Sequence, residues 1–190
     1  MRELRTAVIA AITCTLVLGL AYPLVMTGVG QALFPNRADG SMAGDAGSKL
    51  IGKDFSKRKD DFQSRPSVTG YAPAATFFNN QGPNQKALAG QLDGFARAYL
   101  ARERPYTPGL TRRGIPSDAV TTSASGVDPQ ISEANARIQA NRVARRRGLP
   151  LARVLTLVDD HASRPLFGLA GPKSINVLQL NAALDREPSR

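Results

Sequence analysis

The sequence predicts an α+β protein in which one N-terminal transmembrane helix precedes a single small mixed α+β domain. Residues 6–34 contain no charged side chain, and about 20 apolar residues are enough to cross a bilayer as a helix. The rest of the 190-residue chain is long enough for one domain with a core of its own. In that part, segments with helical periodicity alternate with short segments bounded by turn residues.

The uncharged run favours a membrane anchor that is retained. We expect residues 1–5 to be a cytoplasmic N-terminus and residues 6–28 to be the transmembrane helix, because a lone segment in lipid satisfies its backbone only as a helix. Arg2 and Arg5 outnumber Glu3, and this excess of positive charge keeps the N-terminus in the cytoplasm. The domain that follows is therefore expected to be extracytoplasmic.

A cleaved signal peptide is the main alternative for this run. It would begin with the same basic residues and would end at small residues, of which 19–21 and 30–32 are candidates. The apolar part of a signal peptide is normally about 7 to 15 residues long, and this run is about twice that length. The anchor is the better interpretation.

The composition limits the chemistry of the domain. The chain has a single cysteine, Cys14, and a single histidine, His161, so we expect neither a disulfide nor a cysteine-based metal site. The net charge of +10 suits nucleic acid, acidic lipid headgroups or an acidic protein partner. An extracytoplasmic location removes nucleic acid from these candidates.

Residues 29–48 are predicted to be a flexible tether because they become small, polar and rich in glycine, and residues 49–190 are predicted to be the domain. Within the domain, residues 50–55 are a strand candidate. Apolar residues at helical spacing predict a helix over 85–102, which Asn84 caps and Pro105 ends.

A second helix is predicted from Ser132, as N-cap, to Arg147, with Gly148 after its end. The basic run 145–147 suits the negative end of that helix dipole, and a phosphate or headgroup patch is the alternative. Pro150 can open a further short helix. Residues 175–185 read as a strand that turns into a terminal helix near Asn176 or Asn181.

Several short segments occur in one order along nearly the whole chain. They are 20–23 in the anchor, 50–52 and 62–67 early in the domain, 80–83, 116–118 and 122–132 in the middle, and 139, 142–144 and 176–181 towards the end. In this order the chain resembles the C subunit of the bacterial Kdp complex, an ATP-driven, high-affinity potassium pump. The residues that carry the resemblance, and that we take as candidates for family-specific structure and partner contact, are Tyr22, Pro23, Arg65, Pro66, Ser67, Asn80, Gly82, Pro83, Asp118, Ser123, Ser125, Gly126, Asp128, Pro129, Ser132, Arg142, Asn176 and Asn181.

The resemblance implies a non-catalytic accessory subunit of the bacterial inner membrane. In this family the potassium path belongs to a channel-like partner, and ATP hydrolysis belongs to a P-type ATPase partner. The subunit is described as a catalytic chaperone that raises the ATP affinity of the hydrolysing partner. We therefore expect no catalytic residue, no metal and no cofactor of its own, with ATP bound only through the catalytic partner.

The resemblance also implies a nucleotide-linked role for a glutamine, which corresponds here to Gln139 with Ser125 and Gly126 nearby. A glycine-containing loop before a helix can bind phosphate, yet the sequence has no P-loop motif. The predicted topology also places Gln139 on the side without ATP. We predict instead that Gln139 and residues 123–132 serve packing and partner contact.

A membrane-tethered periplasmic hydrolase or binding module is the alternative function. It would use Ser123 or Ser125 as a nucleophile, with Asp128 and His161 as the supporting acid and base. A serine nucleophile needs its base within hydrogen-bond reach. The sequence alone leaves that distance open.

Overall fold

The computed structural model describes residues 1–44, 47–75, 81–163 and 171–188. The chain divides into two compact units, Met1–Ser48 and Lys49–Arg190, and each is described here by itself. Among the predicted site residues, Asn80 lies outside the described residues.

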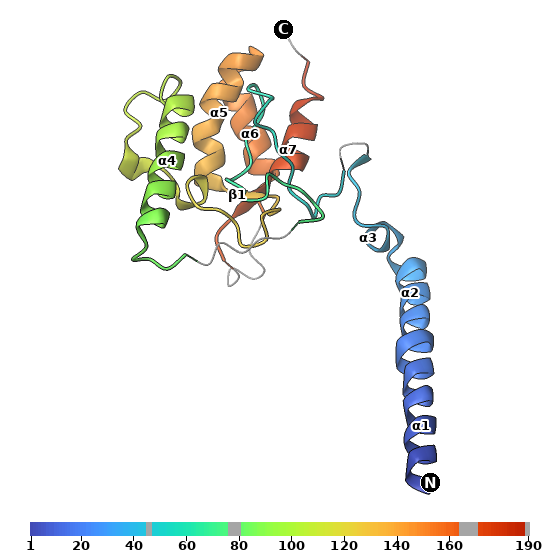
Figure 1. Cartoon of the computed structure of the whole chain (residues 1–190). Coiled ribbons are helices and arrows are strands. Elements are labelled where there is room, and N and C mark those ends of the chain that lie inside the picture. The colour runs from blue at the N-terminus through green and yellow to red at the C-terminus, as the bar shows by residue number, and fades with distance from the viewer. Residues whose placement is uncertain (45–46, 76–80, 164–170, 189–190) are drawn as a thin grey trace. The chain divides into compact units, whose positions relative to one another are not determined.

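The first unit is built on one long helix, in which α1 (Arg2–Cys14), the π-helical segment η1 (Thr15–Ala21) and α2 (Tyr22–Leu33) follow one another without a break (Figure 1). Pro23 explains the π-helical segment. Its nitrogen has no proton to donate and its ring crowds the carbonyl four residues earlier, so the preceding turns widen. Among the described residues this is the one helix long and apolar enough to cross a membrane.

The helix continues past residue 28 and ends at Leu33, so residues 29–33 are helical and not part of a flexible tether. Between residue 28 and that point the sequence has no charge and no proline. Phe34 then leaves the helical conformation, with φ −139°, because Pro35 disfavours a helical residue before it. A single short turn, α3 (Pro35–Ala38), follows.

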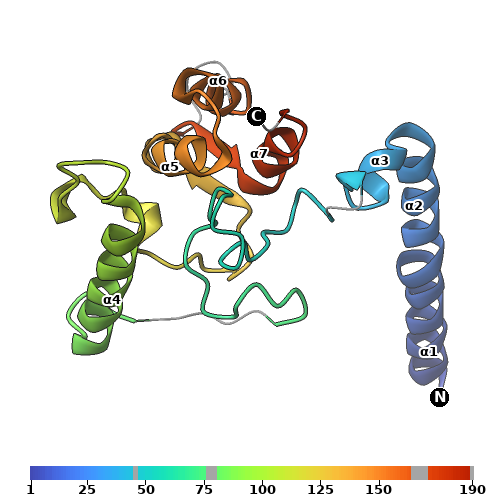
Figure 2. The ribbon, with the colours of Figure 1, turned by 90° about the horizontal axis from the view of Figure 1, so that it is seen from above.

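In the second unit three helices lie side by side, as Figures 1 and 2 both show: α5 (Glu133–Arg147), α6 (Leu151–Asp160) and α7 (Val177–Leu184). Their facing sides are apolar and fully buried, which places the main core of the domain among them. Its members include Ala136, Ala140, Val143, Val154, Val158, Leu180 and Leu184.

A two-stranded antiparallel sheet joins the starts of α5 and α7. Strand β1 (Gln130–Ser132) pairs with β2 (Ser174–Asn176), and the buried residues Ile131 and Ile175 lie opposite each other. The mixed α+β prediction is therefore confirmed, with a domain that is largely helical among the described residues. The prediction of a strand over residues 50–55 is wrong, because that segment is irregular and pairs with no strand among the described residues.

The helix predicted over 85–102 is α4 (Lys86–Glu103), and Figure 2 shows it apart from α6 and α7. Gln85, not Asn84, is its N-cap residue. A smaller apolar cluster lies at its C-terminal half, where Tyr99 packs with Leu110 and with Ala119. Two short 3₁₀ turns, η3 (Arg112–Gly114) and η4 (Ser117–Ala119), complete this side of the domain.

The predicted helix ends of α5–α7 are confirmed. The Ser132 hydroxyl accepts from the backbone N–H of Asn135 at 3.1 Å, which caps α5. Gly148 adopts φ +67° after α5, a conformation that glycine takes without strain. Asn176 caps α7 through the N–H of Gln179. Pro150 precedes α6, whose buried side consists of Val154, Leu157 and Val158.

Candidate functional site

Most of the predicted site residues meet around residues 54–71, which we call the central loop. This loop has no regular secondary structure, and it runs between α4 and the three packed helices (Figure 2). A buried backbone without strand or helix partners must bond to side chains. The central loop does so through residues that the sequence had singled out.

Two side-chain amides replace the missing strand partners of the loop. The Gln139 Oε1 accepts from the Gln63 backbone N–H at 2.7 Å, and its Nε2 donates to the Gln63 carbonyl at 3.1 Å. Asn181 does the same for Phe62, at 2.9 Å for both bonds. Gln139 is 1% exposed and Asn181 is 2% exposed. Both amides are therefore used inside the fold.

Arg142 and Glu103 form a buried ion pair that ties α5 to α4. The Arg142 Nε lies 3.0 and 3.1 Å from the two carboxylate oxygens, and Glu103 is 0% exposed. Arg142 also donates to the carbonyls of Lys59 and Asp61 and to Gln139 Oε1. Desolvation lowers the pKa of Arg142, and the Glu103 charge partly offsets this effect.

Asp118 organises the start of α5. Its carboxylate accepts from the Ser132 backbone N–H at 2.9 Å, from the Ser132 hydroxyl at 2.7 Å and from the Asn135 amide at 2.9 Å. The Asn135 oxygen in turn accepts from the Tyr99 hydroxyl and from Gln139 Nε2, both at 3.0 Å. One connected network therefore links η4, α4, α5 and the central loop.

The second half of the central loop is held against residues 121–128. Arg65 makes an ion pair with Asp128 at 2.8 Å and donates to Thr121. The Ser67 hydroxyl donates to the Gly126 carbonyl at 2.6 Å. Gly126 has φ +74°, which favours glycine at that position.

Tyr71 closes this part of the loop. Its φ is +64°, uncommon for a residue with a side chain, and its hydroxyl donates to the Arg65 carbonyl at 2.5 Å. Burial raises the pKa of Tyr71 to about 12. A Cβ atom at Gly52 would lie 2.6 Å from the Tyr71 ring and 2.6 Å from the Asp128 carbonyl, so only glycine fits there.

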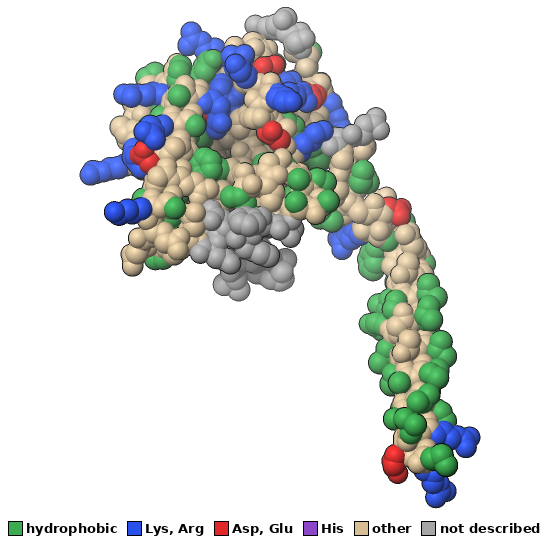
Figure 3. Space-filling view, viewed as in Figure 1, with side chains coloured by type: hydrophobic (Ala, Val, Ile, Leu, Met, Phe, Trp, Pro, Cys, Tyr) green, Lys and Arg blue, Asp and Glu red, His purple; other side chains and the backbone are tan. Residues whose placement is uncertain are grey.

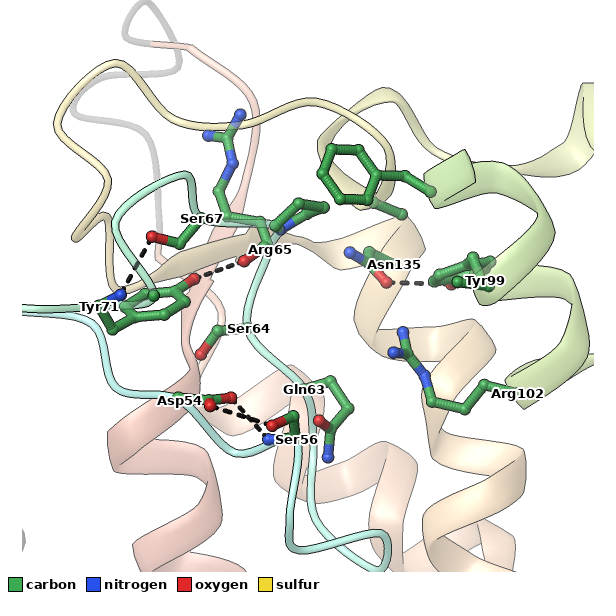
Figure 4. Close-up of a pocket in the computed structure, with 15 residues that line it drawn as sticks. Asp54, Ser56, Gln63, Ser64, Arg65, Ser67, Tyr71, Tyr99, Arg102 and Asn135 are labelled. Atoms are coloured by element: carbon green, nitrogen blue, oxygen red, sulfur yellow. Dashed lines mark hydrogen bonds between the residues drawn. The ribbon is translucent and has the colours of Figure 1, made fainter. Parts of the chain in front are cut away.

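The central loop and α4 enclose a cavity of about 270 Å³. Figure 4 shows Gln63, Ser64 and Tyr71 of the loop on one side and Tyr99 and Arg102 of α4 on the other. Most of the polar side chains around it are already bonded to other parts of the fold. This arrangement favours a structural network over a site for chemistry.

The residues of the alternative hydrolase are not brought together. Ser123 and Ser125 accept from the backbone N–H groups of Gly126 and Val127. The His161 Nδ1 instead lies 2.8 Å from the Leu157 carbonyl. Over 81–163, where all of these residues are described, no hydrogen bond joins the histidine to either serine or to Asp128. Likewise, no group of three possible metal ligands occurs in the described part of the chain.

The remaining predicted residues have separate places. Tyr22 and Pro23 belong to the long helix of the first unit. The Gly82 carbonyl accepts from Gln85 in the turn before α4, where Pro83 also lies, and among the described residues no hydrogen bond joins Gly82 or Pro83 to the central loop. Pro66 lines the cavity, the Pro129 carbonyl accepts from Val177, and the Asn176 amide donates to the Lys49 carbonyl at 2.6 Å.

Sequence reasoning missed a second charged cluster, which holds the C-terminal end of α7. Asp61 is paired with Arg58 at 2.7 Å and with Arg147, and Asp185 lies 3.0 and 2.8 Å from the same two arginines. Partial burial opposes ionisation of Asp185, yet hydrogen bonds from Arg147 and Arg58 lower its pKa. Arg58 and Asp61 are three positions apart, but the other pairs join distant parts of the chain, and no local pattern reveals them.

Glu103 was also missed, although a signal was present. It continues the helical stripe of Ala96 and Tyr99, so an acidic residue occupies a position where an apolar one is expected. A carboxylate on the buried side of a helix requires a buried cation. The sequence could therefore have predicted a partner for Glu103, though not that Arg142 would be this partner.

The fold and the network together define a class of protein: one helix long enough to cross a membrane, followed by a small domain whose irregular loop is held by buried polar side chains. Residues 4–186 match the family model KdpC, described as K+-transporting ATPase, c chain. The chain belongs to this family.

Curated relatives match over almost their whole length. A potassium-transporting ATPase KdpC subunit of Caulobacter vibrioides is 46% identical over 97% of this chain and 93% of the relative. The corresponding subunit of Pseudomonas aeruginosa is 42% identical over 96% of each chain, and that of Cereibacter sphaeroides is 40% identical over 97% of each.

Proposed function

We propose that this chain is the single-pass accessory subunit of an ATP-driven potassium-uptake complex in the bacterial inner membrane. The observation that carries the proposal is the extent of the family match, which covers the long apolar helix and the domain together. The relatives are named as subunits of a potassium-transporting ATPase. In our proposal the chain assembles with a potassium-binding, channel-like subunit and with an ATP-hydrolysing subunit.

The chain contributes no catalytic group in this proposal. Support comes from the site, because the polar residues of the family motifs bond to one another and to the central loop. Any effect on the ATP affinity of the pump acts through the catalytic partner. In particular, the Gln139 amide is 1% exposed and bonded at both of its ends, so it has no group to offer a nucleotide unless the central loop is displaced.

The domain lies outside the cytoplasm in this proposal, with the N-terminus inside. The excess of positive charge before the long helix supports this orientation. Since Cys14 is the only cysteine and lies within the anchor, a cysteine placed elsewhere is the one thiol that an aqueous reagent reaches. We expect Arg145→Cys to be labelled in intact spheroplasts by a membrane-impermeant maleimide, and Arg2→Cys to be labelled only after the membrane is permeabilised. The reverse labelling would reject the orientation.

Assembly is tested by purification after mild solubilisation. A tagged copy of the chain should bring two large membrane subunits with it when the pump is expressed. If the tagged chain is recovered alone from such membranes, the proposed role fails.

A further inference from the structure

A second cavity of about 460 Å³ lies next to the first, and both are lined by Arg102. Three elements form its walls. The central loop contributes Lys59, α4 contributes Arg102, and α5 contributes Arg142 and Arg146. Lys and Arg make up four of the ten lining residues, and none of the ten is acidic. Figure 3 shows many basic and few acidic side chains over the face that carries α4 and α5.

Nearby carboxylates leave part of this positive charge unbalanced. Glu103 is buried between Arg102, at 2.7 Å, and Arg142, at 3.0 Å, so one carboxylate serves two guanidinium groups. Asp60 is half-exposed and lies 3.7 Å from Arg146. The ion pairs of the described residues include none that involves the Lys59 ammonium group. The cavity therefore keeps an excess of about two positive charges.

The basic run at the end of α5 is divided between different roles. Arg147 is bonded to Asp61 and Asp185, and Arg145 is exposed and does not line the cavity. Arg146 alone of the three lines it. The helix dipole favours a basic residue at each of these three positions. It therefore does not explain why Arg146 lines the same cavity as Arg102 and Lys59.

We propose that this cavity binds a phosphate group, either as a free phosphate ester or inorganic ion or as the headgroup of an anionic phospholipid. Cations that approach from three elements suit a tetrahedral anion with several free oxygens better than a flat carboxylate, which one guanidinium can satisfy. The Tyr106 hydroxyl accepts from Arg146 at 3.5 Å and so keeps its own proton to donate. Ala98, Ala101 and Pro105 form an apolar wall for the organic part of such a ligand.

The test uses the full-length chain in nanodiscs and measures the thermal unfolding midpoint of the domain. In one arm, inorganic phosphate is added to phosphatidylcholine discs and compared with chloride at equal ionic strength. In the other arm, phosphatidylglycerol is included in the discs without added phosphate. A ligand that binds only the folded domain raises the midpoint, here by roughly 2 to 4 °C near saturation.

The decisive variants compare two pairs of exposed residues. The double change Lys59→Gln with Arg146→Gln removes two cavity charges, whereas Lys57→Gln with Arg145→Gln removes two neighbouring charges that do not line the cavity. We expect the first pair to weaken phosphate binding at least tenfold and to lose the shift, and the second pair to keep it. Arg146→Gln alone should lose part of the shift and serves if the double variant unfolds.

The arm that shows the variant-dependent shift identifies the source of the phosphate group. A shift with inorganic phosphate supports a soluble ligand, and a shift with phosphatidylglycerol supports a lipid headgroup. The proposal is overturned if neither arm shifts the midpoint. It is equally overturned if both pairs of variants lose the shift to the same extent, since that result would indicate a general response to positive charge.

Discussion

The two sides of the domain are held together by different kinds of contact. Helices α5, α6 and α7 pack through apolar side chains that are almost wholly buried. The side formed by α4 and the central loop buries a smaller apolar cluster around Tyr99 together with Phe55 and Phe62 of the loop, and it relies in addition on buried hydrogen bonds and the ion pair between Glu103 and Arg142. The family motif residues of the domain concentrate on the second side or at its border with α5.

This difference predicts different tolerance to substitution. Apolar packing is non-directional, so a residue of similar volume can replace another with modest cost. A buried polar network is directional, and the removal of one member leaves its partners without bonds in a medium of low dielectric constant. The side with α4 should therefore be the one that conservative changes damage most.

Glu103→Ala is expected to have the largest effect. It leaves the Arg142 guanidinium buried at 2% exposure without its charge partner, which should cost about 3 to 5 kcal/mol of the free energy of unfolding. Chemical denaturation of the full-length chain in detergent, followed by the near-ultraviolet signal of tyrosine, measures the loss.

The double variant Glu103→Met with Arg142→Leu provides the control for this prediction. Replacing both charges by apolar side chains removes the uncompensated charge, so most of the stability should return. A single variant as stable as the wild type would show that the ion pair is not what holds α4 to α5.

Gln139→Ala is expected to cost about 2 to 4 kcal/mol, because the N–H and the carbonyl of Gln63 both lose their partner inside the fold. Asn181→Ala is a matched variant, since it removes the amide that bonds in the same way to the N–H and the carbonyl of Phe62, the residue before Gln63. Denaturation should show a loss for both variants, and the larger one for Gln139→Ala, because Gln139 also bonds to Asn135 and Arg142.

The same two variants test the nucleotide-linked role of Gln139. If the amide acts only within the fold, the ATP dependence of the assembled pump changes equally in both variants, or in neither. A loss of ATP affinity with Gln139→Ala that Asn181→Ala does not reproduce, at equal stability, would instead favour direct participation of Gln139.

The elements that the sequence predicted correctly are those with local causes. The cap at Ser132, the glycine after α5 and the apolar spacing of α6 each involve residues within a few positions of one another. The arrangement of the central loop has no such cause, because Gln63 and Phe62 bond to side chains 76 and 119 positions away. The prediction of a strand over 50–55 failed for a related reason: its pattern suits a strand, but no strand in the described part of the chain pairs with it.

The motif residues were found by resemblance, and their contacts were not predicted. A pattern identifies Gln139, Arg142 and Asn181 as distinctive, but it does not reveal that they bond to a loop. Tyr71 carries no local signal at all, since nothing in its neighbourhood demands a positive φ. Such contacts depend on the tertiary fold, which spacing along the chain does not specify.

The buried tyrosines predict a loss of stability at high pH on the side with α4. Burial raises the pKa of Tyr71 from 10.0 to about 12, and burial with the nearby Glu103 charge also raises the pKa of Tyr99. The tyrosines of the unfolded chain ionise at a lower pH than those of the folded domain. Their contribution to the free energy of unfolding is therefore complete below pH 10 and declines as the pH rises through 12. For Tyr71 the decline is roughly 2 to 3 kcal/mol. Denaturation at several pH values should show a shallower decline for Tyr71→Phe, and an unchanged slope would contradict the prediction.

Leu180→Met is expected to have the smallest effect, less than about 1.5 kcal/mol, although Leu180 is as completely buried as Glu103. The flexible methionine side chain can fill the volume of Leu180 in the apolar core without leaving a polar group unpaired. Leu180→Ala, measured beside it, should cost about 2 to 5 kcal/mol, because it leaves a void that the helices cannot close. The comparison depends on the first value: if Leu180→Met costs as much as Gln139→Ala, the apolar side is no more tolerant than the polar one, and the contrast between them does not hold.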